Sequence, residues 1–370
     1  MQVPVVKFNT KDQPEFFKEL RKNVNAYFKE NNISRYANYN MKIKTVFMLN
    51  LYFVPFILIL TGVVSSVWWV MLMWALMGLG MAGIGFSIMH DANHGSYSKN
   101  QKINNAFGSL IYFIGGYDKN WRIQHNVLHH SFTNVDGYDE DIDLGIIRLS
   151  PNQKRKKYHY LQMFYAPVIY GFMMLNWTTV KDFVQIFNYN KKNLLKGQGL
   201  TLSKGLTQVI FVKLGYYALT LVLPLLVIDL PWWQILMGYL LMHIICGLII
   251  AFIFQVAHVL EETEFFTTNE DGSVENNWAI HQMKTTANFA NKSVWFSWLI
   301  GGLNFQIEHH LFPNICHVHY RKISKIVKQT AEEFNIPYKQ HKTFFGAIKS
   351  HLTLLNRLGT GKYDKMMAKA

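Results

Sequence analysis

The stretch WWQILMGYLLMHIICGLIIAFIFQV, residues 232–256, contains no Asp, Glu, Lys or Arg. A helix needs about 20 consecutive apolar residues to cross the hydrocarbon core of a bilayer, so this stretch predicts a transmembrane helix. Three further stretches have the same character, at about 45–64, 67–89 and 208–228. Helices of this length that are apolar on every side are unusual in the core of a soluble domain. The four stretches therefore predict an all-α integral-membrane protein.

The composition supports this interpretation. Half of the 370 residues are apolar and only 16% are charged, against roughly 25% in soluble domains. The net charge of +14 has two explanations, nucleic-acid binding or cytoplasmic loops that lie beside anionic lipid. The apolar stretches favour the lipid explanation and disfavour a nucleic-acid partner. The chain has two cysteines, Cys246 and Cys316, which argues against a disulfide framework, a thiolate zinc site or an iron–sulfur cluster.

The connections predict the topology. Ser65–Ser66 and Asp229–Pro231 join neighbouring stretches and carry no Lys or Arg, whereas residues 1–44, the central segment and residues 321–370 are rich in both. The positive-inside rule then places these basic segments in the cytoplasm, with two helical hairpins crossing the membrane. We expect an N-terminal arm (1–44), a membrane domain (45–320) and a C-terminal tail (321–370). Lys213, near the start of the third stretch, is expected to snorkel to the interface. The visible absence of a targeting signal favours a bacterial inner membrane.

Histidines form three clusters, which read His90-Asp-Ala-Asn-His94, His125-Asn-Val-Leu-His129-His130 and Gln306-Ile-Glu-His309-His310; His258 follows the fourth stretch. Helical residues four apart share a face, so each of the first two clusters can present two imidazoles to one site. His130, about 100° further round the helix, is expected to reach a second ion. All the clusters lie on the side predicted to be cytoplasmic, so we expect them to converge.

Eight clustered histidines and Gln306 exceed what one metal ion can bind, so the pattern indicates two ions. A zinc protease would show HExxH, and a carboxylate di-iron bundle would show Glu-x-x-His repeats; neither motif is in the sequence. A haem uses one or two axial histidines. An imidazole-rich site at a membrane surface suits oxygen activation on an apolar chain, and this chemistry needs a redox-active metal rather than zinc.

HDANH, HNVLHH and QIEHH resemble the three histidine boxes of the membrane fatty acid desaturase superfamily, and the glutamine of the third box resembles the front-end subgroup. The resemblance implies four transmembrane helices under a cytoplasmic helical cap. It also implies an oxygen-dependent desaturase that acts on acyl-CoA or acyl-lipid with two iron ions and O₂, and with no haem or flavin in this chain. The metal ligands that it implies are His90, His94, His125, His129, His130, His258, Gln306, His309 and His310.

The resemblance also implies partners. Many front-end desaturases carry a fused cytochrome b5 domain with an HPGG motif; that motif is not found in this sequence, and 44 residues are too few for the domain. Electrons are therefore expected from a separate cytochrome b5 or ferredoxin-like donor with its reductase. Two alternatives stay open at this stage: a fatty-acyl hydroxylase or ketolase on the same scaffold, and a metal-binding membrane protein. The second is disfavoured because acidic and histidine residues do not repeat through the predicted spans.

Residues outside the boxes have weaker signals. Some of the acidic residues after the second box are expected to accept hydrogen bonds from ligand imidazoles, unless they form a solvated loop: Asp136, Asp139, Glu140, Asp141 and Asp143. Asp91 and Glu308, inside boxes, have the same two interpretations. Arg148 and the run Lys154–Lys157 are expected to contact a phosphate headgroup or coenzyme A, or to bind anionic lipid.

The remaining histidines and tryptophans are assigned by position. His243, in the middle of the fourth stretch, is expected to be neutral and hydrogen-bonded between helices, while His159, His341 and His351 are expected at the surface. His317 and His319 are not expected to be ligands. Trp121, Trp295 and Trp298 are expected as interface anchors or packing residues. His281, Asn277 and Trp278 remain open.

Overall fold

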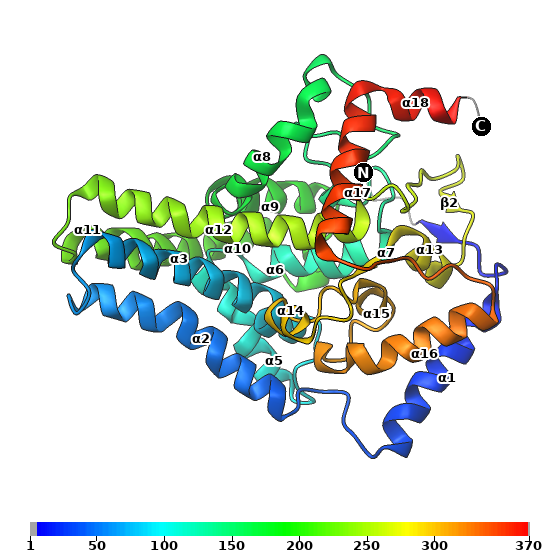
Figure 1. The fold of residues 1–370 in the computed structure, drawn as a ribbon, viewed down its shortest axis with the longest axis horizontal. Coiled ribbons are helices and arrows are strands. Elements are labelled where there is room, and N and C mark those ends of the chain that lie inside the picture. The colour runs from blue at the N-terminus through cyan, green and yellow to red at the C-terminus, as the bar shows by residue number, and fades with distance from the viewer. Residues whose placement is uncertain (1–5, 369–370) are drawn as a thin grey trace. The chain divides into compact units, whose positions relative to one another are not determined.

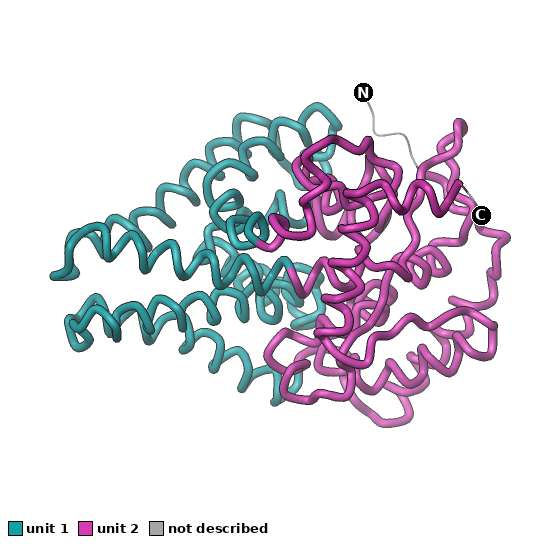
Figure 2. The backbone as a smooth tube through the Cα atoms, turned by 45° about the horizontal axis from the view of Figure 1, so that its top comes forward, with its two compact units in different colours: residues 1–3, 38–123, 168–251 teal, residues 4–37, 124–167, 252–370 magenta. Residues whose placement is uncertain are grey.

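The structure is a computed structural model that describes residues 6–368. The first five residues of the predicted arm and the last two of the predicted tail lie outside this range. The described chain is mostly helical, with two short pairs of parallel strands (Figure 1). It divides into two compact units (Figure 2). Unit 1 comprises residues 38–123 and 168–251; unit 2 comprises 6–37, 124–167 and 252–368.

Four helices are long and apolar enough to cross a membrane, which confirms the predicted number of spans. They extend over Tyr39–Leu60, Val67–Asn93, Leu202–Val227 and Trp232–His258. The first and third begin about six residues before the predicted starts, because Asn38 and Thr201 cap them. The side-chain oxygen of each cap accepts a hydrogen bond from the backbone N–H three residues on, Met41 and Lys204 respectively.

Two of these helices contain a π-helical turn, in which backbone hydrogen bonds join residues five apart. The second membrane-length helix is α3 (Val67–Gly83), then the π turn η1 (Ile84–Ile88), then α4 (Met89–Asn93). The third is α10 (Leu202–Tyr217), the π turn η8 (Ala218–Val222) and α11 (Leu223–Val227). The first and fourth are the continuous helices α2 and α12.

Glycines let the long helices of unit 1 approach closely. A Cβ on Gly80 of α3 would lie 2.6 Å from the backbone nitrogen of Tyr52 in α2, and a Cβ on Gly78 would lie 2.7 Å from the carbonyl oxygen of Met242 in α12. Small residues at crossings are the usual means of close packing between membrane helices. Unit 1 also contains these elements: α5 (Gln101–Gly108), η2 (Ser109–Ile114), α6 (Asp118–Trp121), η6 (Trp177–Lys181), α9 (Asp182–Lys191) and η7 (Leu195–Gln198).

Lys213 does not snorkel, so this prediction was wrong. Its side chain is buried, and its ammonium donates hydrogen bonds to the carbonyl oxygens of Gly115 (2.6 Å) and Trp177 (2.8 Å). It also pairs with the carboxylate of Asp182 at 2.5 Å. Since a buried charge is tolerated only when it is paired and hydrogen-bonded, Asp182 and the two carbonyls explain why a lysine lies inside an apolar helix.

Unit 2 is built around helices from both ends of the chain. Helix α1 (Pro14–Glu30) packs against α16 (Tyr320–Glu333), with Phe16, Leu20 and Val24 buried in a cluster that includes Ile323 and Val327. The strand pairs are β1 (Lys7–Phe8) with β2 (Ser273–Val274), and β3 (Asn288–Phe289) with β4 (Gln340–His341). The other elements of unit 2 are α7 (His130–Phe132), η4 (Glu140–Ile142), η5 (Lys157–Leu161), α13 (Trp278–Thr285), α14 (Val294–Leu299), α15 (Gln306–Leu311), η9 (His317–His319), α17 (Phe344–Thr360) and α18 (Lys362–Met367).

Three helices run from one unit into the other along the chain. They are the π helix η3 (Arg122–His129), α8 (Gln162–Asn176) and α12 (Trp232–His258). The histidines of η3 and the last histidine of α12 belong to unit 2.

Candidate metal centre

Unit 2 brings six of the predicted ligand histidines together from three parts of the sequence. They come from η3 and α7 (His125, His129, His130), the end of α12 (His258) and α15 (His309, His310). One group contains His129, His258 and His310, and another contains His130, His309 and His310; within each group, the candidate ligand atoms lie within 4.8 Å of one another. Of the six, His125 is half-buried and the other five are buried.

The π helix changes which imidazoles of the second box meet. The expectation that His130 turns away from His125 was wrong: their Nε2 atoms lie 3.2 Å apart, and Nε2 of His130 is 3.0 Å from that of His309. Residues 122–129 form a π helix, whose wider turn brings positions five apart toward the same side. Three Nε2 atoms therefore meet at one point.

His129 has the arrangement that is typical of a metal-binding histidine. Its Nδ1 donates to the carboxylate of Asp139 at 3.1 Å, which confirms the expected role of that acid. Its Nε2 is buried and has no hydrogen-bond partner among residues 6–368. Burial alone would lower the pKa of His129, but the charge of Asp139 and its hydrogen bond outweigh burial and raise it. Burial likewise opposes ionisation of Asp139, yet His129 and two backbone N–H groups keep the pKa of that carboxyl low.

Oxygen atoms hold the neighbouring imidazoles in the same tautomer. Nδ1 of His310 donates to the amide oxygen of Gln282 at 2.8 Å, and Nδ1 of His258 donates to the carbonyl oxygen of Thr285 at 3.3 Å. Each of these rings therefore keeps the lone pair of Nε2 for another partner. On His309, Nδ1 lies 3.2 Å from the hydroxyl of Tyr320. Hydrogen bonds on the far nitrogen of this kind orient the histidines of metal sites.

Helix α13 supports the second histidine box and includes residues to which the sequence alone assigned no role. The indole N–H of Trp278 and the side-chain amide of Gln282 each donate to the carbonyl oxygen of His130 at 3.2 Å. Nε2 of His281 donates to the carbonyl oxygen of Thr133 at 2.7 Å. Burial lowers the pKa of His281 to about 4. Asn277 caps α13 by accepting from the N–H of Ala279. These residues position the second box, and His281 is not in any group of candidate metal ligands within the described chain.

Of the other acidic residues, Asp141 lies beside His129, whereas Asp136 and Glu308 bind residues other than the histidines. Asp141 accepts a hydrogen bond from Gln124 and lies 3.7 Å from Nδ1 of His129. Asp136 instead accepts from Ser150 and Asn152. Glu308 faces away from the imidazoles and accepts from Asn288 and Tyr338, and burial raises its pKa to about 7.

Gln306 is buried at the first position of α15, and its side chain interacts with that of His258. It therefore lies on the side of the cluster that His258, His129 and His310 form. The side chain of Gln306 therefore contacts one histidine of this group.

In unit 1, the first box lies on α4, directly after the π turn η1. The rings of His90 and His94 have centroids 4.7 Å apart, as expected for residues four apart on a helix. The ring of Trp121 lies 5.6 Å from each of them. Trp121 is thus a packing residue beside this box. Within unit 1, the predicted pairing of the two histidines is confirmed.

Two histidines that were expected at the surface are buried. His351 of α17 is fully buried, and its Nδ1 donates to the carbonyl oxygen of Val259 at 2.8 Å. His159 is 3% exposed and accepts a hydrogen bond from the N–H of Lys156. His341 is partly exposed and faces Glu262 at 3.2 Å. His243 bridges Tyr216 and the carbonyl oxygen of Tyr239, as expected. Isolated histidines carry no periodic pattern, so their burial could not be inferred.

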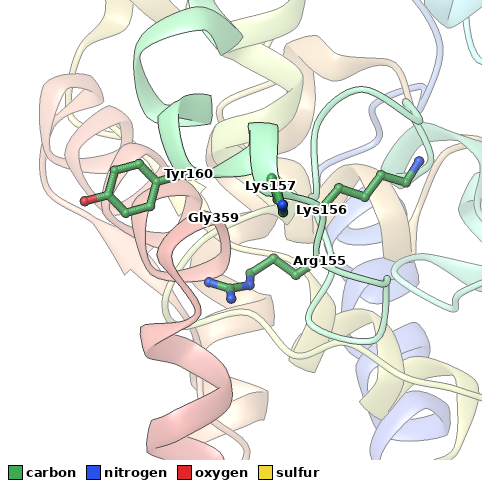
Figure 3. Close-up of a pocket in the computed structure, with 5 residues that line it drawn as sticks. All are labelled: Arg155, Lys156, Lys157, Tyr160 and Gly359. Atoms are coloured by element: carbon green, nitrogen blue, oxygen red, sulfur yellow. The ribbon is translucent and has the colours of Figure 1, made fainter.

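The expected phosphate role of Arg148 was wrong, because its guanidinium is buried and occupied. It donates to the carbonyl oxygens of Leu358 (2.9 Å) and Pro151 (2.5 Å) and pairs with Asp364 at 2.8 Å. The neighbouring basic run does line an open pocket of about 330 Å³, formed by Arg155, Lys156, Lys157, Tyr160 and Gly359 (Figure 3).

Together, four membrane-length helices and buried histidine clusters define a membrane protein that can hold metal ions. The family model for fatty acid desaturases matches residues 66–342, and the chain belongs to this family. It is therefore an oxidoreductase that desaturates fatty acids. The match also favours desaturation over the alternatives of hydroxylation, ketolation and simple metal binding.

Three curated desaturases align with almost the whole chain. The chain is 35% identical over 351 residues to an sn-1 linoleoyl-lipid 6-desaturase of Synechocystis sp., covering 93% of this chain and 95% of the relative. It is 34% identical to the enzyme of the same name from Arthrospira platensis (95% and 94% covered). It is 37% identical to an acyl-lipid (8-3)-desaturase of Physcomitrium patens (95% and 73% covered). These are front-end desaturases, as the glutamine of the third box predicted.

Proposed function

We propose that this desaturase is an acyl-lipid enzyme that introduces a cis double bond into an already unsaturated chain with a histidine-ligated di-iron centre. The observation that carries the proposal is the buried cluster of imidazoles in unit 2, three of which have Nδ1 hydrogen-bonded to an oxygen atom. The relatives named above act on linoleoyl-lipids or acyl-lipids, which supports an esterified acyl chain as substrate.

The residues fit a metal. Imidazole nitrogen–zinc bonds are about 2.0–2.1 Å long, and bonds of similar length would put neighbouring ligand nitrogens on one ion about 3 Å apart. The Nε2 atoms of His125, His130 and His309 have this spacing, at 3.2 and 3.0 Å. The unpartnered, buried Nε2 of His129 supports a second position. We propose that the protein binds two metal ions. The proposed ligands of unit 2 are His125, His129, His130, His258, His309 and His310, with Gln306 as a further ligand or an orienting residue, and those of unit 1 are His90 and His94.

Bound iron would supply the one-electron chemistry with O₂ that zinc cannot provide. In the overall reaction, –CH₂–CH₂– plus O₂, two electrons and two protons gives –CH=CH– plus two H₂O. The chain's own residues orient the histidine ligands and exclude bulk water. Asp139 fixes the proton of His129 on Nδ1, while Gln282 and Thr285 do the same for His310 and His258. Burial of these rings keeps bulk water from the reacting atoms.

We further propose a domain organisation and a membrane orientation, which the basic segments support. The arm (1–44) and the tail (321–370) flank a membrane domain (45–320), both termini and the metal centre are cytoplasmic, and the membrane is a bacterial inner membrane. The charge of +14 and the short, uncharged or acidic turns within the two hairpins support this orientation. The two electrons come from a separate cytochrome b5 or ferredoxin-like protein with its reductase.

The test is mass spectrometry of the fatty acids of a host that makes linoleoyl lipids, expressing the wild-type chain with a reductase and donor. A new species 2 mass units lighter supports the proposal, and derivatisation locates its double bond. His129→Ala should abolish the product. His341→Ala, at a partly exposed histidine outside the cluster, should keep it. A product 16 mass units heavier would instead make the enzyme a hydroxylase.

Metal content tests the di-iron part separately. Purified, folded wild-type protein should contain close to two iron ions per chain, and His129→Ala should contain less. Folded, active protein that lacks iron or contains another metal would overturn the assignment of iron without touching the desaturase activity.

A further inference from the structure

Helix α14 displays large apolar side chains to solvent. Val294, Trp295 and Leu299 are 64%, 77% and 45% exposed, and Phe345, at the start of α17, is 80% exposed. We call these four residues the α14 patch. All of them lie outside the four membrane-length helices. Exposed clusters of large apolar residues usually mark an interaction surface.

The patch is rigidly built. Phe296 of α14 packs against Phe344 of α17, with ring centroids 5.1 Å apart, and both rings contact Phe289. Ser293 caps α14 by accepting from the N–H of Phe296. The two helices are therefore held together by aromatic contacts around the buried ring of Phe289, while the neighbouring residues Trp295 and Phe345 remain exposed.

The same helix is tied to the third histidine box. After α14, Gly301 and Gly302 adopt positive φ angles of 62° and 68°, a conformation that favours glycine, and turn the chain toward α15. The side-chain amide of Asn304 then donates to the hydroxyl of Ser297 at 2.9 Å, and Gln306 begins α15 two residues later. A short, hydrogen-bonded connection therefore joins α14 to the helix that carries His309 and His310.

The sequence segments that form the patch are basic, and Glu262, an acidic residue from outside these segments, is bound by His341 and Ser350. No Asp or Glu occurs from Ala290 to Ile307 or from Pro337 to Tyr363, whereas Lys292, Lys342 and Lys349 are exposed. A twofold contact between two copies would place each patch, with its lysines, against the same patch of the partner. Like charges would then meet. Anionic lipid headgroups offer the opposite charge, and tryptophan beside lysine is typical of membrane interfaces.

We propose that the α14 patch inserts into the lipid surface and holds the third histidine box at a fixed depth beside the membrane. Trp295 and Phe345 enter the boundary between headgroups and acyl chains, and the lysines remain among the headgroups. This inference does not depend on the metal or on the reaction of the proposed function, because it rests on the exposure, charge and connections of α14 alone.

Site-directed spin labelling of the full chain in liposomes of phosphatidylcholine and phosphatidylglycerol tests the inference. Both native cysteines, Cys246 and Cys316, are buried, so a cysteine introduced at the surface is labelled selectively. The test variants are Trp295→Cys and Phe345→Cys. The control is Lys325→Cys on α16, an exposed position of the same unit.

At positions 295 and 345, the label should collide with dissolved O₂ several-fold more, and with a water-soluble nickel chelate several-fold less, than at position 325. Equal collision rates at all three positions would overturn the proposal. Strong coupling between identical labels on two chains would overturn it in favour of a dimer contact. If a cysteine variant fails to fold, the conservative Trp295→Phe variant should lose part of the fluorescence quenching that brominated lipids cause in the wild type. Unchanged quenching would also count against lipid contact.

Discussion

At the scale of single residues, the second histidine box depends on its acid. Asp139 is fully buried, and a buried carboxylate is tolerated because it accepts hydrogen bonds from His129 and from the N–H groups of Asn134 and Asp141. The pair holds a proton on Nδ1 of His129, so the neutral ring presents the lone pair of Nε2. A negative charge next to the imidazole also makes it a more basic ligand.

Asp139→Asn should weaken metal binding by about 10- to 100-fold, the usual cost of losing a carboxylate behind a metal-binding histidine. Bound iron per chain is to be measured during titration with a chelator. Asp136→Asn is the matched control, because Asp136 lies in the same loop but contacts Ser150 and Asn152 instead of histidine. Equal loss of iron in both variants would show that the loop matters only for folding.

Arg148, a residue type that is usually exposed, is buried here and holds two backbone carbonyls and Asp364 in place. Arg148→Met should lower the free energy of unfolding by about 1–3 kcal/mol, since it leaves buried carbonyl groups without their donor. Arg148→Lys should recover little, because an ammonium cannot reproduce the planar fork. Unfolding in detergent, followed by circular dichroism, measures both. Arg155→Met, at the exposed pocket of Figure 3, should change stability by less than about 0.5 kcal/mol, and a comparable loss there would contradict the assignment.

At the scale of elements, the ion pair of Lys213 and Asp182 connects α10 to the start of α9, and the carbonyls that Lys213 binds belong to η6 and to the turn after η2. One side chain thus fixes three segments of unit 1. Asn120 donates to Asp182 as well, so the carboxylate is fully occupied.

Lys213→Met should destabilise the protein by about 3–5 kcal/mol, because it strands the carboxylate of Asp182 away from water. Adding Asp182→Asn should restore part of the loss, since the remaining amide is neutral. Denaturant unfolding of the two variants and of Asp182→Asn alone gives the coupling energy. A double variant that is no more stable than Lys213→Met would mean that the stranded charge is not the cause.

At the scale of the whole molecule, acid should destabilise the fold through buried histidines. Burial lowers the pKa of His351 to about 4, whereas an unfolded histidine titrates near 6.5. Between these values the unfolded chain binds a proton that the folded chain does not. Stability therefore falls as the pH drops through 6.5 toward 4, by up to about 1.4 kcal/mol per pH unit for each such histidine.

His351→Gln should flatten this slope, because glutamine can donate to Val259 without titrating. Unfolding midpoints at pH 7.5 and 5 give the comparison: the difference between the two should be smaller for the variant than for the wild type. A variant with the full acid sensitivity of the wild type would show that His351 does not contribute.

Much of this molecule could be predicted from patterns that repeat. Apolar length located the four helices, and the spacing of His90, His94, His125 and His129 located the helical boxes. Residues with single, long-range partners were not predictable. The sequence contains no sign that Lys213 meets Asp182, that Arg148 meets Asp364, or that Gln282 and Tyr320 hold His310 and His309. Such contacts depend on how distant segments pack.

The π helix of the second box makes the enzyme sensitive to a single-codon deletion in its gene. A π turn closes over one residue more than an α turn does, and each residue of an α-helix rotates the next one by about 100°. Loss of the codon for Ile123 or Gln124, which precede the box, would let the helix relax to the α form. The gene would still encode every histidine, but the side chains of His129 and His130 would point in other directions. A gene can therefore keep all three boxes intact and still encode a dead enzyme.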